Sequence, residues 1–100
     1  PYADGSFDCV FAGEVLEHCI YIEGALKELR RVVKPDGCLV VIDKNVEMMG
    51  ALRLDESEQW FATEKVRKIL AEMGGRVTAY EGVPCEGRND KLFTAWIAEK

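Results

Sequence analysis

The stretch that decides the fold of this chain reads Phe7-Asp8-Cys9-Val10-Phe11-Ala12-Gly13-Glu14-Val15-Leu16-Glu17-His18. Its first six residues form a short apolar run behind the turn residues Asp4 and Gly5, which predicts a β-strand over residues 7–12. In open α/β sheets, ligands bind in the crevice beyond the carboxyl ends of the strands. Ala12 and Gly13 end this strand, so they are the first candidates for contact with a ligand.

A helix and a second strand follow this stretch. Apolar residues recur at three- and four-residue spacing over residues 22–33, which predicts an amphipathic helix. Pro35-Asp36-Gly37 is expected to end that helix, because proline cannot continue it and glycine supplies a left-handed turn. The almost unbroken apolar run over residues 38–42 predicts a strand buried on both faces, as in a parallel sheet covered by helices. Together these elements make one strand–helix–strand crossover.

The second half of the chain predicts one more helix and two more strands. Residues 44–60 are irregular, and Thr63 is the expected N-cap of a helix that Gly74-Gly75 closes. Strands are predicted over residues 76–80 and 92–98, with a loop between them around residues 84–90. The whole is an α/β protein of one domain, with a mixed sheet of about four strands and two or three helices.

Composition narrows the classes of partner. The 100 residues are 48% hydrophobic and carry a net charge of −5, which argues against nucleic-acid binding. The basic residues of the first helix are interpreted as part of a solvated face; they are Lys27, Arg30, Arg31 and Lys34. No apolar run reaches the roughly 20 residues that span a bilayer, and no secretory signal is present, so a cytoplasmic protein without membrane contact is expected.

The four cysteines predict neither a metal site nor a disulfide framework. They stand at positions 9, 19, 38 and 85, without the spacing of a zinc motif. Cys9 and Cys38 fall inside apolar strand-like runs, so each is expected to be a buried free thiol. No metal is therefore predicted.

These segments, in this order, resemble the carboxy-terminal half of class I S-adenosylmethionine-dependent methyltransferases. The resemblance covers nearly the whole chain and rests on three stretches in register: Asp4-Gly5-Ser6-Phe7-Asp8, Val10 to His18, and Leu29-Arg30-Arg31-Val32-Val33-Lys34-Pro35-Asp36-Gly37. It implies a Rossmann-like methyltransferase half-domain over residues 1–100, with S-adenosylmethionine as the cofactor of the complete domain. The glycine-rich turn that begins the family's cofactor site is absent, since Gly74-Gly75 follows a helix. The resemblance therefore implies a partial domain, inactive without an amino-terminal half.

The resemblance also assigns candidate site residues. It places Ala12, Gly13 and Glu14 beside the methionine end of the cofactor, where a residue without Cβ permits close approach. Alternatively, Gly13 only eases the turn after the strand. Four residues separate Glu14 from His18, so a helical turn would bring them to one side. His18 is the candidate catalytic base; alternatively it packs the turn, and a structural role is favoured for Glu14.

The irregular segment supplies the candidate substrate contacts. Met48 and Trp60 would suit an apolar methyl acceptor or a lid, because an exposed apolar cluster often marks a binding surface. Alternatively, Trp60 and Phe61 attach the following helix to the sheet, and this interpretation is favoured for Phe61.

Two functions remain open. The first is part of a methyltransferase that acts on a small-molecule acceptor. The second is a non-catalytic binding or assembly module derived from such an enzyme. In either case the strand at residues 8–12 lacks its neighbour in the family's sheet, and its open apolar edge predicts a homo-oligomer, most simply a dimer.

Overall fold

The computed structural model describes residues 2–45, 61–85 and 87–99. Its elements follow the predicted order of strands and helices, with one short 3-10 turn added. They are β1 (Phe7–Gly13), η1 (Leu16–His18), α1 (Ile22–Arg31), β2 (Val33–Lys44), α2 (Thr63–Glu72), β3 (Arg76–Cys85) and β4 (Arg88–Glu99).

One mixed sheet contains all four strands, in the spatial order β1-β2-β4-β3. β1 pairs in parallel with β2, while β4 runs antiparallel to both β2 and β3. The amino-terminal strand is therefore at one edge, and the last strand lies inside the sheet. This arrangement confirms the predicted α/β class and the mixed four-stranded sheet.

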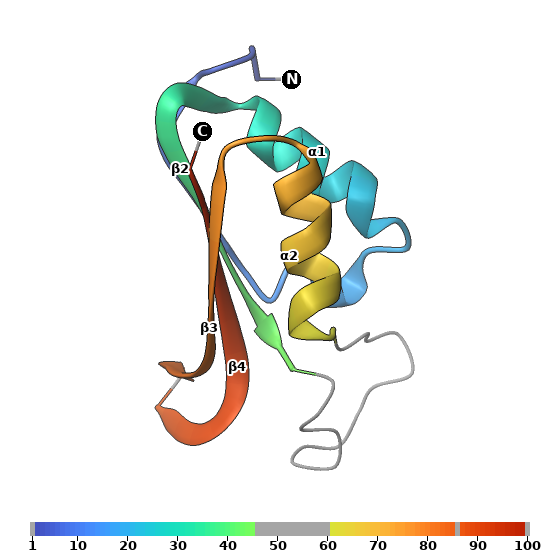
Figure 1. Cartoon of the computed structure of the whole chain (residues 1–100), viewed down its shortest axis with the longest axis vertical. Coiled ribbons are helices and arrows are strands. Elements are labelled where there is room, and N and C mark those ends of the chain that lie inside the picture. Colours follow the sequence, from blue (N-terminus) through green and yellow to red (C-terminus); the bar gives the residue numbers. More distant parts are fainter. Residues whose placement is uncertain (1, 46–60, 86, 100) are drawn as a thin grey trace.

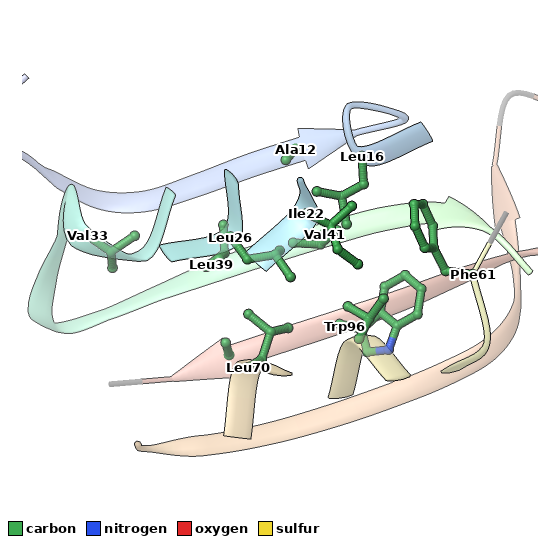
Figure 2. Packing of buried hydrophobic residues seen from close by; sticks show 12 residues of the cluster. Ala12, Leu16, Ile22, Leu26, Val33, Leu39, Val41, Phe61, Leu70 and Trp96 are labelled. Atoms are coloured by element: carbon green, nitrogen blue, oxygen red, sulfur yellow. The ribbon is translucent and has the colours of Figure 1, made fainter. Parts of the chain in front are cut away.

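Both helices pack on the same side of the sheet (Figure 1). Their apolar residues meet the inward-facing side chains of the strands in a single core, to which Leu26, Val41, Leu70 and Trp96 each contribute a side chain that is 0% exposed. Figure 2 shows these residues between the strands and the helices. Burial of this layer supplies the main apolar driving force for the fold.

The opposite face of the sheet is apolar and partly exposed in the described part of the chain. Phe11 on β1 is 65% exposed and Tyr80 on β3 is 50% exposed. Between them, Val40 and Ile42 on β2 and Ile97 on β4 are half-buried and lie outside the core cluster. The prediction that the apolar run of β2 is buried on both faces is therefore wrong for the described residues, because α1 and α2 cover the same face.

Three predicted boundaries shift. α1 ends at Arg31, and β2 already begins at Val33, which pairs with Phe7, so Pro35-Asp36-Gly37 lies within a strand and does not end the helix. The N-cap of α2 is Ala62, and the Thr63 hydroxyl donates to Glu81 Oε2 at 2.8 Å. The last two strands extend into the predicted loop, which shortens the connection between them.

The basic residues of α1 do more than face solvent. The Arg31 guanidinium donates to Asp4 Oδ1 at 2.6 Å and to Glu28 Oε1 at 2.7 Å, and it lowers the pKa of the Glu28 carboxyl. It also donates to the Tyr2 carbonyl at 2.8 Å. Arg30 donates to the Gly74 carbonyl at 2.7 Å. These contacts attach the segment before β1, and the end of α2, to the end of α1.

Candidate functional site at the carboxyl edge of the sheet

Charged side chains gather where β1 and β2 end. The two strands are parallel, and Gly13 is in register with Ile42, so their carboxyl ends meet at one edge of the sheet. Glu14 follows β1 directly, while Asp43 and Lys44 complete β2. This is the edge at which open α/β sheets bind their ligands.

Glu14 is fixed by its backbone and by its side chain. Its φ of 56° is the one positive value among the described non-glycine residues, and its N–H donates to the Ile42 carbonyl at 2.8 Å. Glu14 Oε1 accepts from Lys44 Nζ at 2.7 Å, and these side chains are 25% and 7% exposed. Left-handed backbone in a residue with a Cβ costs free energy and persists where the surroundings enforce it.

The left-handed backbone corrects one prediction. Glu14 and His18 were expected to share a helical turn, but the 3-10 turn η1 begins only at Leu16. A residue with positive φ cannot continue a right-handed helical turn. The spacing of four residues therefore does not bring the Glu14 and His18 side chains to one side of a helical turn.

Asp43 organises the turn from the neighbouring strand. Its side chain is 0% exposed, and Oδ2 accepts from the backbone N–H of Leu16 at 3.1 Å, while Oδ1 accepts from the Lys44 N–H at 3.0 Å. A carboxylate at the start of a helical turn satisfies a backbone donor that the turn itself leaves unpaired. Asp43 thus sets the course of the chain from Glu14 towards His18.

Gly13 lies under an aromatic ring. A Cβ at this position would come within 2.9 Å of Cε1 of the Phe11 ring. The ring is largely exposed, so it covers the glycine on the uncovered face of the sheet without being fixed in a core. The lack of a Cβ therefore makes room for the Phe11 ring over the backbone at the end of β1.

A second polar group extends the edge towards β3. Asn45 Nδ2 donates to Glu81 Oε2 at 2.9 Å, and Thr63 Oγ1 donates to the same oxygen. Asn45 also donates its N–H to the Leu92 carbonyl at 2.8 Å. These contacts join β2, β3, β4 and the start of α2 at the same end of the sheet as Glu14.

The candidate residues from the sequence fall into three groups. Gly13 and Glu14 lie at the edge, whereas the Ala12 side chain is buried in the core and His18 is exposed on η1. Met48 and Trp60 lie outside the described residues. Phe61 is 2% exposed within the core cluster, which confirms the favoured packing role.

Sequence reasoning missed Asp43, Lys44 and Phe11. The available signal was two charged residues directly after the apolar run of β2, at the carboxyl end of a strand. Among the described residues, no group of three or more His, Cys, Asp or Glu side chains is placed to hold a metal ion.

Comparison with known proteins supports the resemblance. The family model described as "Methyltransferase domain" matches residues 1–41. The ubiquinone/menaquinone biosynthesis C-methyltransferase UbiE of Nitrosospira multiformis is 31% identical over 77 residues, which is 77% of this chain and 29% of that protein. A SAM-dependent methyltransferase from Aquifex aeolicus superposes with a TM-score of 0.71 at 25% identity, over 98% of this chain and 48% of that one.

The chain belongs to the class I S-adenosylmethionine-dependent methyltransferases. A second structure, a possible histamine N-methyltransferase from Thermotoga maritima, has the same fold, with a TM-score of 0.76 at 22% identity over 100% of this chain and 59% of that one. Family membership implies S-adenosylmethionine as the cofactor. The chain spans between 11% and 29% of the length of the curated relatives that it matches.

Proposed function

We propose that this methyltransferase chain forms one wall of the cofactor crevice of an enzyme that methylates a small molecule, and that it is inactive alone. The observation that carries the proposal is the conformation of Glu14. At the carboxyl edge of the sheet, beside Gly13, this residue is held in left-handed backbone by the Ile42 carbonyl and ion-paired with Lys44. Such strain is maintained at sites where a fixed geometry serves a ligand.

The residues of this edge fit one side of S-adenosylmethionine. Gly13 leaves room for the Phe11 ring over the backbone, and this exposed ring offers the cofactor an apolar surface. Ala12 would contribute its backbone only, since its side chain is in the core. When bound, the cofactor supplies a methyl group activated by a sulfonium. The chain contains no GxG sequence that could form the glycine-rich part of the crevice.

The turn after Glu14 would face the acceptor. His18 is exposed on η1, and Asp43 fixes the start of that turn through the Leu16 N–H. An imidazole near this edge can take a proton from an acceptor O–H or N–H as the methyl group arrives. Positioning and desolvation contribute more to such a transfer than the base does. Met48 and Trp60 are proposed to contact the apolar part of the acceptor.

Titration of the chain with S-adenosylhomocysteine tests the wall assignment. We expect no micromolar binding by calorimetry, because the site is incomplete. At millimolar ligand, amide resonances of Gly13 and Glu14 should shift in 15N–1H spectra. Gly13→Ala should reduce these shifts, since its new methyl group displaces the Phe11 ring that covers this position.

Gly24→Ala is the matched control for this titration. A Cβ at Gly24 meets the Tyr21 ring at 2.9 Å, as one at Gly13 meets Phe11, but it lies on α1. Its spectra should respond to the ligand as the unchanged chain does. Binding of S-adenosylhomocysteine with micromolar affinity in the calorimeter would show that the cofactor site is complete. Ligand shifts that avoid residues 13 and 14, or that survive Gly13→Ala, would overturn the wall assignment.

The open edge of β1 favours the second candidate function, an assembly module. Within the described residues, β1 pairs on one side only, with β2. Unpaired strand edges are templates for association. We therefore propose that residues 8–12 pair with a second copy, and we expect sedimentation velocity to show a dimer whose population rises with concentration.

Phe11→Pro tests this pairing without breaking the sheet. Successive residues of a strand direct their N–H groups to opposite sides, and the Glu14 N–H donates to Ile42 on β2. The Phe11 N–H, three residues earlier, therefore points to the open edge, where a proline is tolerated. Proline has no backbone N–H, so Phe11→Pro removes a hydrogen-bond donor from the proposed contact between copies, and the population should shift from dimer to monomer.

Phe11→Ala is the matched control, because it removes the same exposed ring and keeps the backbone N–H. The dimer should persist in that variant. A monomer at all concentrations would contradict self-association. If Phe11→Pro leaves the dimer intact, the contact lies elsewhere on the chain. If Phe11→Ala abolishes the dimer, the aromatic ring makes the contact instead of the strand edge.

The remaining partner assignments are part of the same proposal. Neither α-helix of the described chain is long and apolar enough to cross a membrane. The net charge of −5 favours a small acceptor over a nucleic acid. We propose a cytoplasmic location on the grounds of sequence alone.

A further inference from the structure

Two cysteine side chains meet on the uncovered face of the sheet. Cys9 on β1 and Cys38 on β2 are in register, and their sulfur atoms are 3.1 Å apart. The sequence predicted that both thiols would be buried. Instead, Cys9 is exposed and Cys38 is half-buried, because α1 and α2 cover the other face of the sheet. Solvent therefore reaches a pair of adjacent thiols.

The backbone brings these thiols within the range of a disulfide. Neighbouring strands lie about 4.8 Å apart, and disulfide-linked residues have Cα atoms about 4.4–6.8 Å apart. Residues in register on adjacent strands therefore meet this requirement without moving the sheet. The sulfurs, 3.1 Å apart, have to close by about 1 Å to reach the S–S bonding distance of about 2 Å.

We propose that Cys9 and Cys38 form a dithiol site that low-molecular-weight disulfides oxidise reversibly to an intramolecular disulfide. The thiolate of the exposed Cys9 attacks one sulfur of the small disulfide, which forms a mixed disulfide and releases one small thiol. Cys38, after losing its proton to solvent, attacks the Cys9 sulfur and releases the second small thiol. One protein dithiol is oxidised and one small disulfide is reduced to two thiols, so electrons and protons balance.

The surroundings suit a labile bond more than a structural one. Exposed disulfides are reduced more readily than buried ones. The hydrogen bond with Cys9 raises the pKa of the Cys38 thiol, so Cys38 is a slow nucleophile at neutral pH and the exposed Cys9 reacts first. The link would lie directly after the register shift between Phe7 and Cys9 and tie the edge strand to β2. The site does not depend on methyl transfer.

Thiol trapping in glutathione buffers tests the site. The chain is equilibrated with oxidised and reduced glutathione, quenched in acid, alkylated, and digested for mass spectrometry. We expect the Cys9–Cys38 peptide pair to be the main internal disulfide, and at least roughly tenfold more abundant in the folded chain than in urea, because folding raises the effective concentration of the two thiols. Excess reduced glutathione should reverse it.

Single variants separate this pair from general thiol reactivity. Cys38→Ser should leave Cys9 as a mixed disulfide with glutathione, and Cys9→Ser should abolish the internal link. Cys19→Ser is the matched control, because that half-buried thiol donates to the Val15 carbonyl at 3.4 Å just after η1, away from the pair; its link yield should equal that of the unchanged chain. The proposal is overturned if the link is absent, or if it forms equally in urea.

Discussion

Replacing Trp96 by alanine should lower the free energy of unfolding by about 4 kcal/mol, which is within the range measured for large aromatic residues in cores. The side chain is 0% exposed on the inner strand β4, on the side of the sheet where Phe61 and Leu70 lie (Figure 2). Its indole N–H also donates to the Thr63 carbonyl at 2.9 Å, at the start of α2. The substitution therefore leaves a cavity and removes a hydrogen bond between β4 and the start of α2. Urea unfolding followed by circular dichroism measures the loss.

Tyr80→Ala is the control for this prediction. Tyr80 lies on β3 but on the uncovered face, with half of its surface exposed, so its loss should cost no more than about 1 kcal/mol. The total free energy of unfolding of a domain is about 5–15 kcal/mol. If Trp96→Ala leaves too little folded chain to measure a transition, Trp96→Phe replaces it. That variant keeps a ring but loses the donor, and about 2 kcal/mol is expected. Equal costs for Tyr80→Ala and Trp96→Ala would show that the helix layer is not the core.

The order of elements could be read from the sequence because local patterns determine it. The spacing of apolar residues in α1 and α2, and the left-handed glycines at positions 74 and 75, encode their structure without reference to distant residues. The start of β2 could not be read in this way. Val33 joins the strand by pairing with Phe7, which is a contact between distant residues, and pairing overrides the local effect of Pro35.

The site was predictable only in part for the same reason. The end of an apolar strand indicated Gly13 and Glu14. The partner of Glu14, Lys44, lies 30 residues away, and the role of Asp43 depends on a backbone N–H that only the folded turn presents. The exposure of Cys9 was missed because an apolar run indicates burial, but does not reveal how many faces of the sheet are covered.

Breaking the Glu14–Lys44 pair should destabilise the chain more than its position at an edge suggests. Lys44 is 7% exposed as a side chain, its Nζ lies 6.0 Å from the centroid of the Phe93 ring, and Glu14 Oε1 is 2.7 Å from its ammonium. Glu14→Gln removes the carboxylate that the nearly buried Lys44 ammonium contacts at 2.7 Å, so we expect a loss of about 3 kcal/mol by urea unfolding. Lys44→Met leaves a carboxylate that is one quarter exposed to water, and about 2 kcal/mol is expected.

The double variant decides whether these losses come from one interaction. If the two groups stabilise each other, Glu14→Gln with Lys44→Met should cost less than the sum of the single losses by about 1–2 kcal/mol. The surface pair Glu64–Arg67, at 2.6 Å but 74% and 40% exposed, should show no measurable coupling. Additive losses at Glu14 and Lys44 would mean that their ion pair does not maintain the left-handed turn. Coupling would mean that β2 positions Glu14 through its charge, so that the wall beside Gly13 is organised before any cofactor binds.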